Sequence, residues 1–184
     1  MTVRIEATAL PEVLRITSAV HHDSRGWFSE IWNVEAFGGQ AGIPQQWAQF
    51  NAAWSEGDVV RGIHWQLPPA AQVKLVRPLQ GRVIDVAVDL RQHSPTFGRW
   101  VAAELDAEAG DALLIPEGFG HGYRALGGTA LLSYALSAPF APQHERTLRW
   151  NDPMLAIDWG GDGTPKVSAK DAAAPLFTEA DLFS

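Results

Sequence analysis

The residues from 60 to 88 constrain the fold of this chain more than any other stretch. They form two runs rich in β-branched and aliphatic residues, and basic or ionisable side chains stand between the apolar ones at Arg61, His64 and Lys74. Alternate residues of a β-strand point to opposite faces of a sheet, so this pattern predicts strands with one apolar and one polar face. If the polar face points inward, a base and two cations line a pocket.

Helical periodicity is weak throughout the rest of the chain. No apolar repeat of about 3.6 residues persists for three turns except marginally in the C-terminal tail. Short alternating segments instead recur at roughly 8 to 12 residues between Gly and Pro turns, which is typical of an all-β sandwich or barrel. With 184 residues, we expect one domain over residues 1–184, and a jelly roll with two Greek keys and a few short helices fits the number of segments.

Local composition places the individual elements. Strands are predicted where β-branched or aromatic residues alternate with polar ones. They are expected twice within residues 1–20, twice within 60–88, and at 27–32, 47–51, 99–105, 112–115, 129–137, 143–150 and 157–160. Turns rich in glycine or polar residues are predicted at 21–26, 55–58 and 116–123, a brief helix at 34–37, and a loop or helix start at 168–171.

Composition and charge exclude several classes of protein. The chain has no cysteine, so disulfides and thiolate metal sites are excluded. Its apolar runs fall short of about 18 residues and its N-terminus lacks the apolar core of a signal peptide, so we expect no membrane span and a cytoplasmic protein. A formal net charge of -7 disfavours non-specific nucleic-acid binding, although local arginines can still bind a small anionic ligand.

The histidines do not have the spacing of a metal site. A metal-binding β-barrel of the cupin type needs two or three converging histidines and a carboxylate, usually with an H-x-H pair on one strand. Gln66 stands where the second histidine of such a pair would follow His64. His121 has no histidine neighbour and is interpreted from the residues alone as a hydrogen-bonded structural side chain. We therefore expect no metal, which disfavours a metal-dependent oxygenase.

His64 is the candidate general base. A catalytic histidine needs a partner, usually a carboxylate, that holds its tautomer and raises its basicity. Asp85 and Asp89 lie near in the sequence and Asp171 is remote. The residues alone do not choose among these three aspartates, and a satisfied core histidine is an equal alternative.

A series of ordered motifs resembles those of the dTDP-4-dehydrorhamnose 3,5-epimerases. The motifs are D-S-R-G at 23–26, Q-F-N at 49–51, R-G-I-H-W-Q at 61–66, K-L-V-R at 74–77, I-D-V-A-V-D at 84–89, S-P-T-F-G at 94–98, I-P-E-G-F-G-H-G at 115–122 and W-N-D-P at 150–153. The match is collinear from about Asp23 to Asp171. It implies a cupin-like jelly roll (a double-stranded β-helix), a homodimer that exchanges N-terminal strands, no metal or other cofactor, and a dTDP-linked 4-keto-6-deoxy sugar as substrate.

The resemblance also implies catalytic roles. The 4-keto group acidifies the hydrogens at C3 and C5, so a base can form an enolate that is reprotonated from the opposite face. His64 is then the base, Asp171 the carboxylate that orients it, and Tyr134 the proton donor on the other face. Lys74 lies beside the sugar O4, with His121 nearby.

Further residues match family positions that hold the ligand. By resemblance, Arg25 and Arg61 bind the diphosphate, which suits the planar donors of a guanidinium. Contacts to the nucleotide or the sugar are implied for Glu30, Gln49, Asn51, Glu145 and Lys170.

Two positions depart from the resemblance. Phe140 stands where many members carry a second tyrosine, and Trp65 replaces a common phenylalanine. Phe140 keeps an aromatic face but lacks the hydroxyl. The missing hydroxyl affects which sugar carbon, C3 or C5, is placed at the base. Two alternatives therefore stay open: an epimerase acting at C3 alone, and a non-catalytic jelly roll that binds nucleotide sugars.

Overall fold

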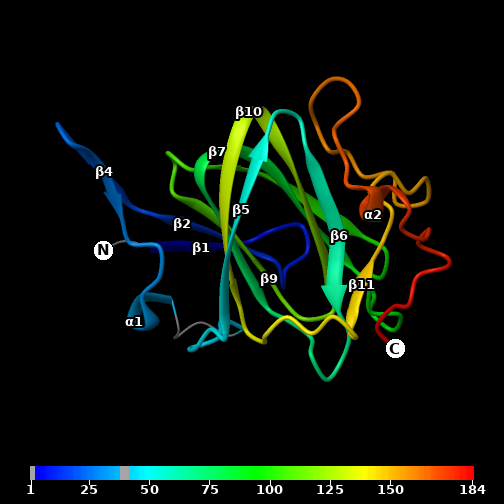
Figure 1. Cartoon of the computed structure of the whole chain (residues 1–184). Coiled ribbons are helices and arrows are strands. Elements are labelled where there is room, and N and C mark those ends of the chain that lie inside the picture. The colour runs from blue at the N-terminus through cyan, green and yellow to red at the C-terminus, as the bar shows by residue number, and fades with distance from the viewer. Residues whose placement is uncertain (1–2, 38–41) are drawn as a thin grey trace.

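The computed structural model describes residues 3–37 and 42–184, and it is almost entirely antiparallel β-structure (Figure 1). The strands are β1 Val3–Ala7, β2 Leu14–Ser18, β3 Val20–Asp23, β4 Gly26–Ser29, β5 Gln49–Glu56, β6 Val60–Gln66, β7 Lys74–Asp89, β8 Trp100–Asp106, β9 Asp111–Ile115, β10 Phe119–Leu136 and β11 Glu145–Thr147, and the helices are α1 Val34–Phe37 and α2 Ala169–Ala172. No helix among the described residues has the length and apolar content needed to cross a membrane.

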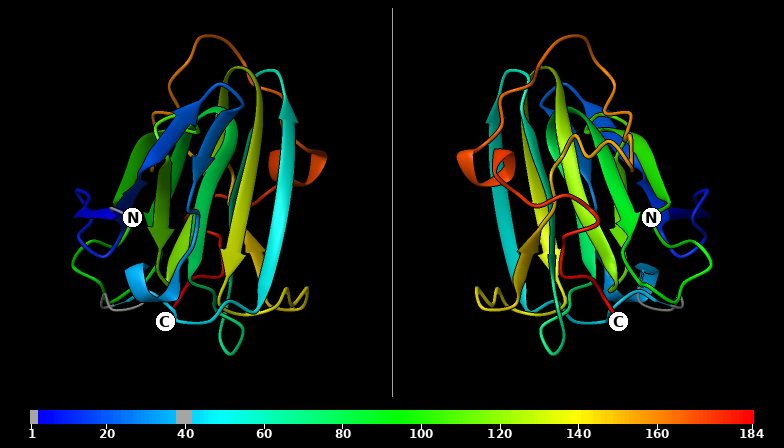
Figure 2. Two further views of the ribbon diagram at one scale, coloured as in Figure 1. Left: turned by 90° about the vertical axis from the view of Figure 1, so that its left-hand side faces the viewer. Right: turned by 90° about the vertical axis from the view of Figure 1, so that its right-hand side faces the viewer.

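Two long strands, β7 and β10, form the centre of the fold. They pair with each other along most of their length. The strand order of the sheet is β1-β2-β9-β7-β10-β6-β11, and in addition β5 pairs with β10 and β8 pairs with β7. The first part of β10 pairs with β6, whereas its last part pairs with β5. Both long strands curve over, so the strands enclose an interior between two layers (Figure 2). This arrangement confirms the predicted all-β jelly roll with short helices.

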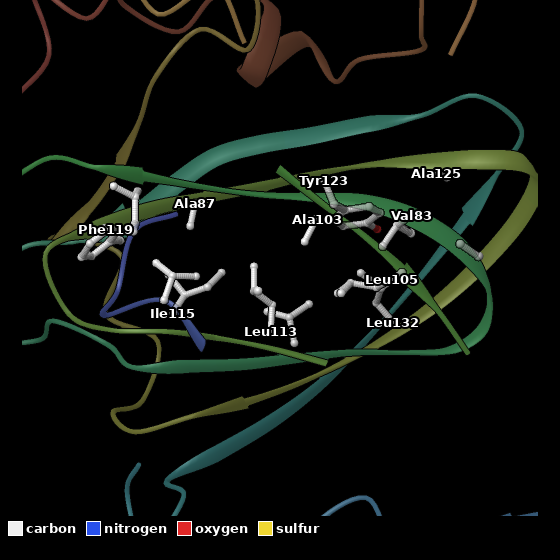
Figure 3. Close-up of a cluster of buried hydrophobic side chains, with 14 residues drawn as sticks. Val83, Ala87, Ala103, Leu105, Leu113, Ile115, Phe119, Tyr123, Ala125 and Leu132 are labelled. Carbon is white, nitrogen blue, oxygen red and sulfur yellow. The ribbon is translucent and has the colours of Figure 1, made fainter. Parts of the chain in front are cut away.

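Aliphatic side chains fill part of the space between the layers. Val83, Leu105, Leu113 and Leu132 are fully buried in one cluster with Tyr123 (Figure 3). A second cluster lies where the C-terminal segment packs against β6 and β7, and there Leu155, Trp159 and Phe177 are buried among others. This packing holds the C-terminal segment, including α2, beside β6 (Figure 1).

The turn predicted at residues 116–123 is confined to Glu117 and Gly118. Strand β10 begins at Phe119, and His121 is a buried strand residue that pairs with His64 on β6. The glycine that follows His121 serves close packing rather than a turn. A Cβ on Gly62 would lie 2.5 Å from the Cα of Gly122, so the two backbones approach as closely as only glycines allow.

Three other predictions need correction. The segment predicted as a turn at 21–26 is mostly the strand pair β3 and β4, which pair with each other and leave a turn only at 24–25. The strand predicted at 27–32 ends at Ser29, and residues 157–160 form no strand. Which strand, if any, pairs with these segments depends on the tertiary structure, and composition alone does not contain that information.

Substituting Gly62 tests the close approach of β6 and β10. We expect Gly62→Ala to lower the free energy of unfolding by about 2 kcal/mol more than Gly128→Ala. Both glycines have positive φ, 122° and 138°, so both alanines strain the backbone, but a Cβ at Gly128 meets no described atom within 4 Å. Urea unfolding of the two variants measures the difference. Equal losses would contradict a packing role for Gly62.

Candidate active site

A cavity of about 910 Å³ opens between the layers, and most of the predicted site residues line it. Strands β5, β6, β7 and β10 form its walls, and the segments after β10 and around α2 form its rim. The predicted residues on its wall are Asn51, Arg61, His64, Lys74, His121, Tyr134, Phe140, Glu145, Lys170 and Asp171. The interior is therefore polar where the alternation of β6 and β7 predicted it.

His64 and Asp171 form a hydrogen-bonded pair at the cavity wall. His64 Nε2 lies 2.6 Å from Asp171 Oδ1, and the carboxylate is buried while the imidazole is about one-third exposed. Asp171 is held in α2, where its backbone N–H donates to the N-cap Ser168 at 3.0 Å. Burial raises the pKa of Asp171, but the hydrogen bonds from His64, the Gly62 amide and Ser168 outweigh it and leave the pKa below its usual value. The aspartate therefore stays ionised beside the imidazole.

The other two aspartates have different partners. Asp85 Oδ1 lies 2.7 Å from Nε2 of His121, and both residues are buried. Asp89 accepts hydrogen bonds from Arg91, Ser94 and Thr96, which lie outside the cavity wall. Burial lowers the pKa of His121 despite the adjacent carboxylate, so this second imidazole is held with little tendency to take up a proton.

Lys74 places its ammonium inside the cavity. It is 8% exposed, and its Nζ donates to the backbone carbonyl of His64 at 3.1 Å. Burial lowers its pKa to about 8, while the negative charges of Asp85 and Glu145 oppose that shift. Lys74 is therefore a cation with few fixed partners, next to the candidate base.

Tyr134 comes from the last part of β10, the part that pairs with β5, whereas His64 lies on β6. Its ring meets that of His121 edge to face, with centroids 5.8 Å apart. Burial raises the pKa of Tyr134 well above its usual value of 10. The phenol therefore stays protonated at neutral pH and can serve as an acid.

The rim residues are held by side-chain hydrogen bonds. The amide N–H of Phe140 donates to Gln49 Oε1 at 2.8 Å, which holds the backbone of Phe140 at the mouth and leaves its ring exposed. Gln49 itself is not part of the wall. Gln49 also donates to Asn51 at 2.9 Å. Lys170 and Glu145 form an ion pair of 2.7 Å on the wall. These groups surround the opening with donors and acceptors.

Two predicted ligand residues lie elsewhere. Arg25 is at the exposed tip of the β3 and β4 hairpin and pairs with Asp23, and Glu30 accepts from Asn33. Neither belongs to the wall of the cavity in its own chain. The hairpin extends away from the body of the fold (Figure 1), and Arg25 is exposed while Glu30, which follows the hairpin, is half-buried.

Several groups at the site carried no sequence motif of their own. Tyr123, Gln72 and Ser168 line the cavity, and Ser55 is bonded to two of its wall residues. Tyr123 stands between His121 and Arg124 in the sequence, and residue type alone does not distinguish a core position from a site. Over residues 3–37 and 42–184, no group of three or more His, Cys, Asp or Glu side chains is arranged to hold a metal ion.

Comparisons with known proteins agree on one family. Residues 7–179 match the family model described as dTDP-4-dehydrorhamnose 3,5-epimerase. The chain is 44% identical over 175 residues to the dTDP-4-dehydrorhamnose 3,5-epimerase of Pseudomonas aeruginosa, covering 95% of this chain and 96% of that one.

Solved structures show the same similarity. One is the dTDP-6-deoxy-D-glucose-3,5-epimerase RmlC of Legionella pneumophila in complex with dTDP-4-keto-L-rhamnose, at 37% identity and a TM-score of 0.92, covering 98% of this chain and 95% of that one. Another is ChmJ, a 3'-monoepimerase of Streptomyces bikiniensis in complex with dTDP-quinovose, at 34% identity and a TM-score of 0.88, covering 94% and 87%.

Proposed function

The chain belongs to the dTDP-4-dehydrorhamnose 3,5-epimerase family and is an epimerase of a dTDP-linked sugar. We propose that His64, Asp171 and Tyr134 invert C3 and C5 of dTDP-4-dehydro-6-deoxy-D-glucose. The product is dTDP-4-dehydro-L-rhamnose. The observation that carries the assignment of residues is the cavity itself, in which a carboxylate-paired imidazole and a protonated phenol come from different strands and meet one substrate-sized space.

The reaction follows from the chemistry of the ketone. His64 removes the proton at C3 or C5, and the electron pair of the broken C–H bond forms an enolate with its charge on O4. Tyr134 then donates its proton to the same carbon from the other face, which inverts the centre. The hydrogen moves as a proton, so no redox cofactor is required. After each inversion, His64 loses its extra proton to water and Tyr134 regains one from water, which resets both groups for the second carbon and for the next turnover.

The developing charge on O4 requires a nearby cation or donor. Lys74 is the buried ammonium of the cavity, and His121, fixed by Asp85, stands beside Tyr134. A preorganised positive group in a low-dielectric cavity stabilises an enolate more than it stabilises the neutral ketone. We assign Lys74 to O4, with His121 as its neighbour.

Proton NMR in deuterium oxide tests the function directly. The purified protein is mixed with dTDP-4-dehydro-6-deoxy-D-glucose, and the signals of the C3 and C5 hydrogens are followed separately. Loss of both signals with formation of the L-rhamno product is the expected result. Exchange at C3 alone would assign the chain to the 3-monoepimerases, the class to which ChmJ belongs. Binding of dTDP with no exchange at either carbon would leave a non-catalytic binding protein.

Phe140 is the residue at which the two epimerase activities are best distinguished. Its ring lies at the mouth of the cavity, and a hydrogen bond to Gln49 fixes its backbone. In the NMR experiment, Phe140→Tyr restores a hydroxyl at this position, with an effect of about 0.5 to 1.5 kcal/mol for one net hydrogen bond. A changed ratio of C5 to C3 exchange would show that this ring controls which carbon is presented.

We further propose a homodimer in which the N-terminal hairpin of one copy completes the cavity of the other. The hairpin that carries Arg25 bears the exposed side chains of Trp27 and Phe28, 45% and 61% accessible, followed by the exposed Ile31. Contiguous exposed apolar groups on a projecting element favour a protein partner. In such a dimer, Arg25 and Glu30 reach the diphosphate and nucleotide bound by the partner.

A mixed dimer distinguishes this arrangement from a site built within one chain. We expect Arg25→Ala to raise KM about tenfold, because it removes a charged contact to the diphosphate. Co-refolding inactive His64→Ala chains with Arg25→Ala chains then restores wild-type KM at one site of each mixed dimer. That site has its own His64 and receives Arg25 from the partner. No restoration would contradict the exchange, and the double variant mixed with itself is the control.

The pH dependence of the reaction should report Lys74. Its pKa of about 8 means that the ammonium is charged below that pH and is lost above it. We therefore expect kcat/KM to fall as the pH rises through about 8, and the corresponding decline of kcat to lie higher because bound diphosphate favours the cation. Lys74→Met should lower kcat/KM about 100-fold and remove this decline. An unchanged alkaline decline in the variant would exclude Lys74 as its source.

A further inference from the structure

Tyr123 is a buried hydroxyl that the reaction described above does not use. The chain has two tyrosines, and this one is 1% exposed within the aliphatic cluster that includes Val83 and Leu132 (Figure 3). A phenylalanine would fill this core position equally well. A buried hydroxyl among aliphatic groups is costly unless it is hydrogen-bonded, so its partners indicate its role.

The hydroxyl of Tyr123 belongs to a chain of side-chain contacts that begins at a cation. Arg61 Nε donates to Ser55 Oγ at 3.1 Å, and Ser55 Oγ lies 2.8 Å from Tyr123 Oη. Because the serine oxygen accepts from a guanidinium, its own proton is free to be donated to Tyr123. The proton of Tyr123 is then free for a further acceptor.

Tyr134 is the group placed to be that acceptor. The two residues lie eleven positions apart on β10, which would separate them by about 36 Å in a straight strand. The register of β10 against β7 shifts between Leu126 and Leu131, and the strand curves over there. Tyr134 consequently packs against the cluster that contains Tyr123, and both residues line the cavity. The proximity of Tyr123 also contributes to the raised pKa of Tyr134.

The chemistry of Tyr134 creates a need for such a partner. Burial is the largest cause of its raised pKa, which means that its phenolate is poorly solvated, and the positive charge of Arg61 acts in the opposite direction. After the phenol has given its proton to the sugar carbon, its oxygen is negative. The Tyr134 side chain is only partly exposed at the cavity wall, so a donor from the protein stabilises the phenolate that forms there.

We propose that Tyr123 is a positioning residue for the reprotonation step, holding the Tyr134 hydroxyl in place and donating a hydrogen bond to the phenolate that forms. Ser55 and Arg61 orient the hydroxyl of Tyr123 toward Tyr134. Arg61 thereby supports the acid of the reaction, in addition to any contact with the diphosphate. The inference rests on the proposed role of Tyr134 as proton donor.

Tyr123→Phe is the test, because it removes one oxygen and leaves the core filled. In deuterium oxide, NMR measures two rates for the wild type and the variant: exchange of the C3 hydrogen, which needs the base, and formation of the epimer, which also needs the acid. We expect the rate of epimer formation to fall about tenfold, as for loss of a hydrogen bond to a charged group, and exchange to change less than about twofold.

Two further variants separate positioning from packing. Ser55→Ala keeps both tyrosines but breaks the link to Arg61, so it should lower the ratio of epimer formation to exchange in the same direction by a smaller factor. Val83→Ala leaves a cavity in the same cluster and should lower the unfolding temperature without moving that ratio. If Tyr123→Phe does not fold, the ratio in Ser55→Ala decides.

The outcomes are distinct from those that test the function itself. A wild-type protein that neither exchanges nor epimerises the sugar contradicts the proposed function, whatever Tyr123 does. An active wild type whose ratio is unchanged by Tyr123→Phe, or an active wild type in which exchange and epimerisation fall together, overturns the inference and leaves the function standing.

Discussion

Replacing His64 with alanine will lower epimerisation by about 10³-fold or more and abolish deuterium exchange at both C3 and C5. The imidazole is the group that Asp171 orients at 2.6 Å on the cavity wall, and a positioned general base contributes about 10² to 10⁴ in rate. Without it, the C–H bond of the ketone is not broken on the enzyme, so exchange and inversion are lost together. NMR in deuterium oxide measures both processes in one sample.

The affinity for dTDP is the control for His64→Ala. His64 is proposed to contact the sugar rather than the nucleotide, so calorimetric titration with dTDP should give nearly the wild-type dissociation constant. Asp171→Asn provides a graded companion, because it keeps the size of the partner and removes its charge. Full activity in His64→Ala would contradict the assignment of the base, whereas loss of dTDP binding would show that the substitution damages the fold.

Tyr134→Phe will separate the two halves of the reaction. We expect epimer formation to fall about 100-fold or more, since the acid on the second face is gone, while exchange at C3 persists within a few-fold because His64 can return a deuteron to the face from which it took the proton. The raised pKa of Tyr134 supports its role as an acid, because a phenol of this kind is protonated across the working pH range.

The ratio of exchange to epimerisation is the measurement that decides this prediction. After a fixed time, NMR distinguishes the epimer from substrate that has taken up deuterium but kept its configuration. Phe140→Ala serves as a comparison, since it removes an exposed aromatic side chain of the rim rather than the partly buried phenol of the wall. If Tyr134→Phe lowers exchange and epimerisation by the same factor, the two-face scheme is wrong.

Much of this protein could be predicted from its sequence, because the signals concerned are local. Alternation along residues 60–88 predicted strands with one polar face, and Arg61, His64 and Lys74 do line one cavity. Arg61 and His64 are three residues apart, and a register shift in the pairing of β6 with β10 lies between them. The recurrent turns and the weak helical periodicity predicted an all-β fold, and the brief helix at 34–37 is present. Periodicity depends only on which side chains neighbour one another along a strand, so it is contained in the sequence itself.

Other features depend on which strands become neighbours. Asp85 and Asp89 are the aspartates nearer to His64 in the chain, yet Asp171, 107 residues away, is the one bonded to it. Spacing along the chain gives no distance between residues on different strands of a jelly roll. The partner is chosen by the packing of the C-terminal segment, including α2, against β6.

The glycines around His121 show the same limit. Their sequence pattern predicts a turn, because a glycine that forms a bend and a glycine that allows two backbones to pack closely are identical in sequence. Only the pairing of β10 with β6 decides that Gly122 meets Gly62. The sequence thus determined the strands and their polar faces through local alternation, whereas the tertiary structure decided the partners of His64 and Tyr134, because register and strand curvature arise from contacts between distant residues.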